Sequence, residues 1–201
     1  MTPTLWLTGD ENADRLLSSD PFALLVGMLL DQQVTMESAF AGPALIAERM
    51  AGLDVRKVAR ANPDEFVALC SQSPAVHRYP RSMAGRIQAV AQHLVDEYDA
   101  DAAQVWRAPT SDGSEPDGRE VLRRLKALPG FGDQKARIFL ALLGKQYGAA
   151  PAGWREAAGA YGEEDARMSI ADVVDQASLD EVRATKKAAK AAAKAAKASK
   201  G

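Results

Sequence analysis

The segment that decides the fold is LPGFGDQKA, residues 128–136. Gly130 and Gly132 flank the single apolar residue Phe131. Because glycine reaches positive φ without steric cost, we expect both glycines to use that freedom in a very tight turn. A Leu- and Arg-rich stretch precedes the turn and an apolar stretch follows it, with apolar residues at helical spacing. This pattern predicts two helices joined by a short hairpin, with Phe131 filling the space between them.

The start of the second helix is a predicted phosphate site. The first N–H groups of a helix have no partner within it and attract anions. Between residues 119 and 145 the acids are Glu120 and Asp133, and seven basic residues oppose them: Arg119, Arg123, Arg124, Lys126, Lys135, Arg137 and Lys145. The alternative is an ordinary helix–turn–helix connection in which Asp133 caps the second helix.

The rest of the chain also predicts helices. Apolar residues recur at helical spacing, and no run of alternating β-branched residues indicates a sheet. We expect helices at residues 10–18, 21–32, 35–49, 54–60, 63–70, 83–98, 118–127, 133–146 and 178–198. Residues 108–118 and 149–162 contain several glycines and prolines, which predicts irregular structure.

Composition excludes several classes of protein. The 201 residues include one cysteine, Cys70, so the chain can form neither an internal disulfide nor a cysteine-ligated iron–sulfur cluster. The longest apolar stretch, residues 21–30, is shorter than the roughly 20 residues that span a bilayer. The first residues lack the pattern of a signal peptide. We therefore expect a cytoplasmic monomer without a membrane partner or a bound metal.

Charge divides the chain at about residue 184. Its net charge is −2, yet residues 185–201 contain no acid and six lysines: Lys186, Lys187, Lys190, Lys194, Lys197 and Lys200. We expect a domain over 1–184 and a partly helical or disordered tail over 185–201 that is attracted to a polyanion. The tail is similar to those of bacterial nucleoid-associated proteins. A solubilising extension or a continued helix is the alternative.

The LPGFG string between two predicted helices resembles the hairpin of the helix-hairpin-helix, or HhH-GPD, superfamily of DNA glycosylases, which includes endonuclease III and the 3-methyladenine DNA glycosylases. The resemblance implies an all-α fold of two lobes with a cleft between them, and the helix-hairpin-helix at about 119–143. It also implies binding to double-stranded DNA in base excision repair, in the bacterial nucleoid.

The same resemblance assigns roles at the hairpin. Amides near Gly130, Gly132 and Gln134 would hold a DNA phosphate, with Lys135 and Arg137 beside them. A monovalent cation bound to hairpin carbonyls would assist, as in relatives. We expect Lys186, Lys187 and Lys190 of the tail to add contacts to DNA.

A second match lies at residues 29–35, LLDQQVT. It resembles the family's helix end, which reads GQQVS or SAQ followed by Thr. Gln33 would then lie at the DNA interface near the opened base pair, where a side-chain amide can both donate to and accept from a base edge. An ordinary polar helix end is the alternative.

The resemblance fails at the family's catalytic aspartate. Residues 151–154, PAGW, resemble the PAGD of relatives, with Trp154 in place of the aspartate. A carboxylate is needed because the transition state of base release carries positive charge on the sugar. Glu156, just beyond, and Asp31, beside the glutamines, are the candidate substitutes.

Lyase chemistry is not expected. Bifunctional relatives use a lysine at the hairpin's seventh position, which is Gln134 here. The family's iron–sulfur cluster is not expected either, because no cysteine follows Cys70. We expect a monofunctional DNA glycosylase-like protein. The alternatives are a catalytically inactive module that recognises damaged or distorted DNA, with Trp154 either stacking on a base or simply packing, and a helical adaptor that binds protein.

Overall fold

The computed structural model describes residues 4–198, and within that range it contains helices and no strand. The elements are α1 (Glu11–Ser19), α2 (Pro21–Leu30), α3 (Met36–Met50), α4 (Val55–Arg60), α5 (Pro63–Ser71), α6 (Pro80–Tyr98), α7 (Gln104–Arg107), α8 (Gly118–Ala127), α9 (Asp133–Lys145), α10 (Trp154–Ala158), the 3₁₀ turns η1 (Gly159–Gly162) and η2 (Ile170–Asp172), and α11 (Gln176–Ala198). The all-α expectation is confirmed.

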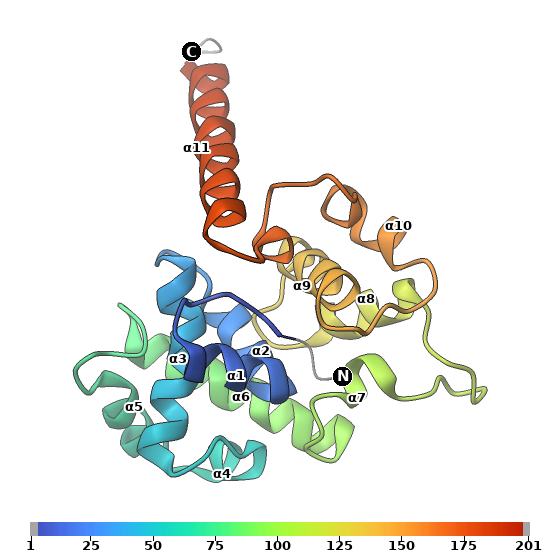
Figure 1. Ribbon diagram of the computed structural model, residues 1–201. Coiled ribbons are helices and arrows are strands. Elements are labelled where there is room, and N and C mark those ends of the chain that lie inside the picture. The colour runs from blue at the N-terminus through green and yellow to red at the C-terminus, as the bar shows by residue number, and fades with distance from the viewer. Residues whose placement is uncertain (1–3, 199–201) are drawn as a thin grey trace.

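The helices form two lobes, which Figure 1 shows one above the other. The first contains α1 to α6 and is built around α2, which contacts α1, α3 and α6. Every residue of α2 from Phe22 to Leu30 is buried, which explains why its sequence is apolar all round rather than on one stripe. No helix between residues 4 and 198 is long and apolar enough to cross a membrane.

The second lobe is built around α9, which contacts α8, α10, η1 and η2. The two lobes share one continuous apolar core. They meet where the start of α9 reaches the end of α2, so that residues about a hundred positions apart lie side by side there. The hairpin between α8 and α9 lies at this junction.

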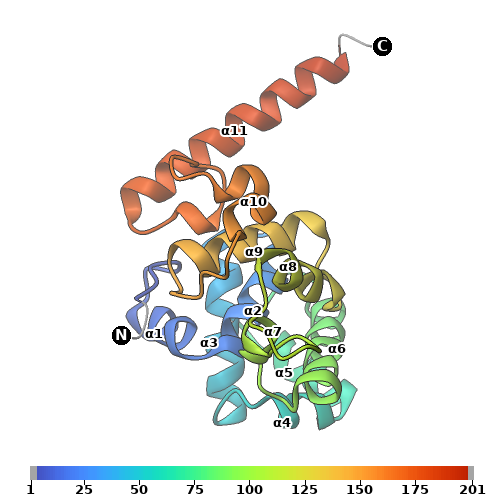
Figure 2. The same ribbon diagram turned by 90° about the vertical axis from the view of Figure 1, so that its right-hand side faces the viewer.

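Helix α11 begins in the second lobe and projects from it (Figures 1 and 2). Leu179 and Val182 in its first turns are buried, and Arg183 pairs with Glu37 of α3. The helix passes residue 184 without interruption and reaches Ala198, so the division of the chain there is one of composition. Residues 199–201 of the expected tail lie outside the described residues.

Short elements account for the differences from the expected helices. Residues 149–162 were expected to be irregular, but they contain α10 and η1. Helix α10 has five residues, too few to show a periodic pattern, and exists because Trp154, Ala157 and Ala158 are buried against the rest of the lobe. Helix α2 ends at Leu30 rather than residue 32, which leaves Asp31 as its C-cap.

Candidate functional site

The hairpin forms a tight corner between α8 and α9. Gly130 has φ of +81°, as expected, but the same expectation for Gly132 is wrong, because its φ is −75°. Gly132 is extended, and a Cβ built on it would meet nothing within 4 Å. Phe131 is buried beneath the corner and packs edge-on against Phe139. The corner therefore exposes main chain on an apolar base.

The N-terminus of α9 is open. No side chain caps it, and within the described chain the N–H groups of residues 132–135 donate no hydrogen bond. The predicted alternative, a cap by Asp133, is wrong. The Asp133 carboxylate instead accepts hydrogen bonds from Lys126 at 2.9 Å and from Arg137 at 2.7 Å, which lower the pKa of Asp133. The free amides at this corner can hold an anion.

Two of the basic residues expected to contact phosphate hold the fold together here. Lys135 Nζ donates to the carbonyl oxygens of Met28 at 2.6 Å and Leu29 at 2.9 Å, at the C-terminal end of α2. Burial lowers the pKa of Lys135 to about 8. Arg137, besides its pair with Asp133, donates to the Ala157 carbonyl at 2.6 Å. These contacts tie α9 to α2 and to α10.

A cavity of about 470 Å³ lies between the lobes. Its polar lining comes from four parts of the chain that the fold brings together: Asp31, Gln32, Gln33, Gln134, Lys135, Tyr161, Thr185 and Lys186. Gln134 Nε2 donates to the Tyr161 hydroxyl at 2.9 Å. The sequence does not predict Tyr161 as a site residue, because Tyr161 lies in the short 3₁₀ turn η1, which carries no motif.

Asp31 is the acid in this cavity. It is half-buried, and among residues 4–198 no group donates a hydrogen bond to its carboxylate. Burial raises the pKa of Asp31, and the nearby ammonium groups of Lys186 and Lys135 partly oppose that rise. A half-buried carboxylate with a raised pKa and no competing hydrogen bond is suited to accept a proton.

The turn after α2 is held from beneath by His77, which is buried. Its Nδ1 accepts the Tyr79 N–H at 3.1 Å, so Nε2 carries the proton and donates to the Gln32 carbonyl at 2.9 Å. Arg86 donates to Gln32 Oε1 at 3.1 Å. With Gln32 fixed, Gln33 takes a φ of +58°, rare for a residue other than glycine, and remains exposed.

The open hairpin and the two helical lobes agree with a family to which most of the sequence is similar. Residues 26–200 match the family described as HhH-GPD superfamily base excision DNA repair protein. The chain belongs to the HhH-GPD superfamily. No curated protein matches it. The match begins within α2 and includes every later helix through α11, so it contains both the LPGFG and the LLDQQVT segments; it confirms the family resemblance and identifies a DNA-glycosylase-like repair protein.

Glu156, the other candidate carboxylate of this HhH-GPD protein, lies elsewhere. It is exposed on α10 and lines a separate hollow of about 400 Å³ with Arg119, Arg123, Lys126 and Arg137. The structure therefore places Asp31 and not Glu156 in the cavity between the lobes.

Trp154, which the sequence resemblance aligns with the family's aspartate, is a packing residue in this structure. It is 7% exposed, and a Cβ at Gly144 would lie within 2.6 Å of its indole ring. A Cβ at Gly118 would likewise lie 2.5 Å from the Cα of Trp154. The Arg155 guanidinium covers the ring at 4.3 Å from its centroid. Packing and not base stacking is thus the role of Trp154.

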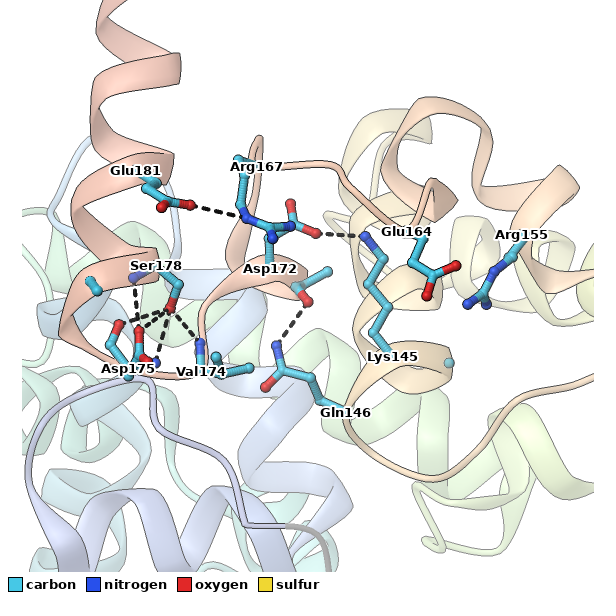
Figure 3. A pocket seen from close by; sticks show the side chains of 13 residues that line it. Lys145, Gln146, Arg155, Glu164, Arg167, Asp172, Val174, Asp175, Ser178 and Glu181 are labelled. Atoms are coloured by element: carbon cyan, nitrogen blue, oxygen red, sulfur yellow. Dashed lines mark hydrogen bonds and ion pairs between the residues drawn. The ribbon is translucent and has the colours of Figure 1, made fainter.

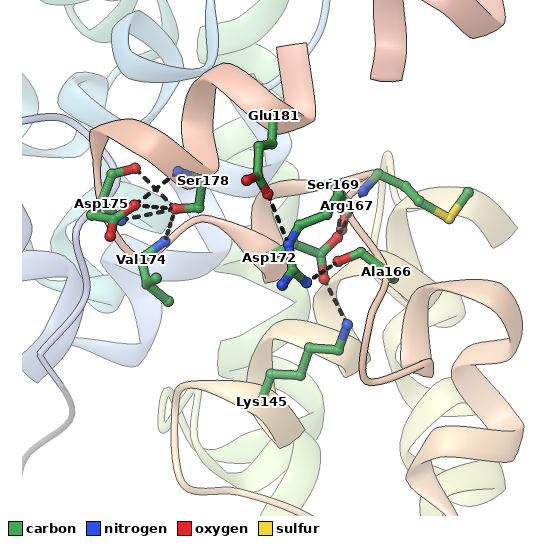
Figure 4. Close-up of polar contacts among 10 residues, drawn as sticks. Lys145, Ala166, Arg167, Ser169, Asp172, Val174, Asp175, Ser178 and Glu181 are labelled. Atoms are coloured by element: carbon green, nitrogen blue, oxygen red, sulfur yellow. Dashed lines mark hydrogen bonds and ion pairs between the residues drawn. The ribbon is translucent and has the colours of Figure 1, made fainter. Parts of the chain in front are cut away.

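A third hollow, of about 520 Å³, lies at the first turns of α11 (Figure 3). Its main charged groups are paired with each other, Lys145 with Asp172 at 2.6 Å and Arg167 with Glu181 at 3.0 Å. Asp172 also accepts hydrogen bonds from the Met168 and Ser169 amides (Figure 4). These contacts fix the segment before α11 and hence the direction in which α11 leaves the lobe.

Cofactor sites can be assessed only at the hairpin. Within residues 4–198 no group of three or more His, Cys, Asp or Glu side chains could hold a metal. The Leu128 carbonyl accepts the Phe131 amide at 3.0 Å and keeps a second lone pair that a monovalent cation could use. The cation expected there stays a prediction.

Proposed function

We propose that this protein binds damaged double-stranded DNA at the hairpin, draws one nucleotide into the cavity between the lobes, and hydrolyses its N-glycosidic bond. The observation that carries the proposal is the half-buried Asp31 in that cavity, near two ammonium groups and without a hydrogen bond to its carboxylate from any of residues 4–198. A hydrolytic glycosylase needs such a carboxylate at the sugar.

The exposed corner of the hairpin is the proposed binding site for the DNA backbone. The free amides of residues 132–135 point to solvent at the start of a 13-residue helix, whose dipole favours an anion. Lys126 and Arg137 lie beside them and add positive charge even while they pair with Asp133. Gln33, exposed and held in a fixed backbone conformation, is our candidate for contact with the opened base pair.

The cavity between the lobes is the proposed site of the extruded nucleotide. Its volume of about 470 Å³ is within the roughly 300–1,000 Å³ of small-molecule sites. Extrusion costs a few kcal/mol, and least for a damaged or mismatched base, so it contributes to selectivity. Gln134 and Tyr161 offer an amide and a hydroxyl to the base or sugar.

Asp31 is the proposed catalytic carboxylate. As the bond between C1′ and the base nitrogen breaks, positive charge develops on the sugar, and the carboxylate stabilises it. Water attacks C1′ and forms the new C–O bond, and Asp31 accepts the proton that the water loses. The departing base takes up a proton from solvent, and Asp31 then releases its own proton to solvent. The raised pKa of Asp31 improves it as a base, provided that it stays ionised in the complex.

We further propose that the reaction stops at base release. Gln134 cannot form a Schiff base, and the amino group of Lys135 is committed to two α2 carbonyls. The protein is then monofunctional. We expect it to act as a monomer, in the bacterial nucleoid where its DNA substrate lies.

One observation favours a second candidate, a DNA-binding module that does not cleave. Trp154 occupies the position of the family's aspartate and is committed to packing. In this alternative the hairpin and cavity recognise distorted DNA, and Asp31 has no chemical role.

Base release from a panel of duplexes that contain uracil, alkylated purines, 8-oxoguanine or mismatches separates the two candidates. We expect release from at least one duplex, and Asp31→Asn to slow it by about 10²–10⁴-fold, the usual contribution of a general base. Glu156→Gln is the matched control and should keep the wild-type rate, because Glu156 lies outside the cavity. Release that survives Asp31→Asn would refute the role of Asp31, and no release from any duplex would favour the binding module.

A further inference from the structure

The C-terminal lysines do not all face the same surroundings. Among those whose side chains the structure describes, Lys186, Lys187, Lys190 and Lys194, Lys186 alone lines the cavity that contains Asp31. It does so with Thr185 and Ala189, its neighbours on α11. Successive helical residues point about 100° apart, so the side chain of Lys187 leaves the helix in a different direction.

The position of Lys186 is set by the anchored start of α11. Leu179 and Val182 are buried, and Arg183 pairs with Glu37 across the lobes. Asp175 accepts the Ser178 amide at 2.8 Å and caps the helix (Figure 4). Lys186 follows within one turn of Arg183, so the helix holds it over the cavity, and the C-terminal part of α11 projects away from the lobes (Figure 2).

Five titratable or charged groups lie near Asp31 or contact its neighbours in the cavity lining. They are Lys186 on α11, Lys135 on α9, Glu37 on α3, Arg86 on α6 and Tyr161 on η1. Arg86 donates a hydrogen bond to Gln32, and the Tyr161 hydroxyl accepts one from Gln134. The negative charge of Glu37 repels the Asp31 carboxylate. Lys135 is bonded to two carbonyls, and burial disfavours its charge.

Lys186 is therefore the cation best placed to interact with the Asp31 carboxylate. It is exposed and forms no ion pair or hydrogen bond with any described residue. We propose that Lys186 is a positioning residue of the cavity, whose ammonium keeps the Asp31 carboxylate ionised, so that the first turns of the C-terminal helix complete the site. Its importance for base release rests on the proposed function, but its effect on Asp31 does not.

The direct test is a titration of the Asp31 carboxyl carbon by NMR in protein labelled at aspartate, with Asp31→Asn used for assignment. Lys186→Met should raise the midpoint of the Asp31 titration, because it removes the opposing positive charge. Lys187→Met, one residue along, is the matched control and should leave the midpoint in place, and Lys186→Arg should restore the wild-type value. An unchanged midpoint in Lys186→Met, or an equal rise in Lys187→Met, would overturn the proposal.

A second readout uses the released-base assay on whichever duplex proves to be a substrate. Lys186→Met should move the acidic limb of the pH–rate profile to higher pH, whereas Lys187→Met should weaken duplex binding and leave the profile in place. A shifted titration in a protein that releases no base would support the contact and refute the glycosylase function. Normal base release with an unshifted titration would refute the role of Lys186 alone.

Discussion

At Gly130 the conformation of one residue connects the hairpin to the first lobe. Its φ of +81° is a region that L side chains rarely adopt, and a Cβ there would lie 2.7 Å from Cδ1 of Leu29 in α2. The missing side chain thus serves two purposes: it allows the turn, and it allows the turn to close on α2. Gly132 serves neither purpose, because its backbone is extended and its Cβ position is open.

Gly130→Ala should therefore destabilise the protein. We expect the free energy of unfolding to fall by at least about 1–2 kcal/mol, the cost of a left-handed conformation in an L residue, because the contact with Leu29 adds to it. Urea denaturation followed by circular dichroism measures the loss. If Gly130→Ala proves as stable as the wild type, the corner has a different conformation in solution.

Sequence alone predicts some of these residues and not others. The LPGFG string predicts the positive φ of Gly130 and the burial of Phe131, since both depend on neighbours along the chain. It cannot predict that Lys135 turns inward, because the carbonyls it meets belong to Met28 and Leu29, over a hundred residues earlier. The role of Trp154 likewise depends on two distant glycines, Gly144 and Gly118.

Among the elements, the contact of α9 with the end of α2 sets the width of the cavity. The last carbonyls of a helix lack partners within it, and the negative end of its dipole favours a cation. Lys135 donates hydrogen bonds to the last carbonyls of α2 and places a positive charge at the negative end of the helix dipole. Its ammonium group is partly buried there, and this burial lowers the pKa of Lys135 to about 8.

This cost predicts a pH dependence of stability. In the unfolded chain Lys135 should titrate near its usual value of 10.5, so between about pH 8 and 10.5 the unfolded state binds more protons than the folded state. The free energy of unfolding contributed by Lys135 should thus rise with pH across that window. Denaturation at several pH values should show this rise in the wild type and lose it in Lys135→Met.

Lys187→Met is the control for that comparison and should keep the wild-type slope, because Lys187 is exposed and does not line the cavity. Equal slopes for the wild type and Lys135→Met would contradict the burial of the ammonium group between α2 and α9.

Element prediction succeeds for helices of six residues or more and fails for shorter ones. Apolar spacing is sufficient for α3, α6, α8 and α9, each of which repeats its buried face over several turns, whereas α2 is predicted by its continuous apolar run. Helices α7 and α10 have four and five residues, and their existence depends on burial against other elements rather than on any local pattern.

For the whole molecule, the family resemblance and the helical pattern predicted the two lobes, but not which residues line the space between them. Four separate parts of the chain meet at the cavity, and only the folded arrangement shows that Asp31 is inside it and Glu156 outside. The sequence also leaves the length of α11 undecided, because alanine favours a helix while the lysines repel each other.

The projecting part of α11 should act as an electrostatic arm. Residues 191–195 are exposed and lie beyond Lys186 and Ala189 of the cavity lining, so removing residues 191–201 should leave stability unchanged and preserve the cavity. We expect weaker binding to undamaged duplex, most at low salt, with a shallower dependence of log affinity on log salt, since each neutralised phosphate contributes about 0.9 to that slope. Fluorescence anisotropy over a range of KCl concentrations gives the slope. An unchanged slope would show that the arm does not contact DNA.

The central claim is that the hairpin presents its main-chain amides to a DNA phosphate, and the affinity of Gly132→Ala for duplex DNA tests it most directly. The substitution fits the extended backbone and open space at this position, so folding should be preserved, while the added methyl group keeps a phosphate from the amides. Loss of hydrogen bonds to a charged group, at about 1.5–3 kcal/mol, predicts at least roughly tenfold weaker binding. Wild-type affinity in a normally folded Gly132→Ala protein would contradict the account.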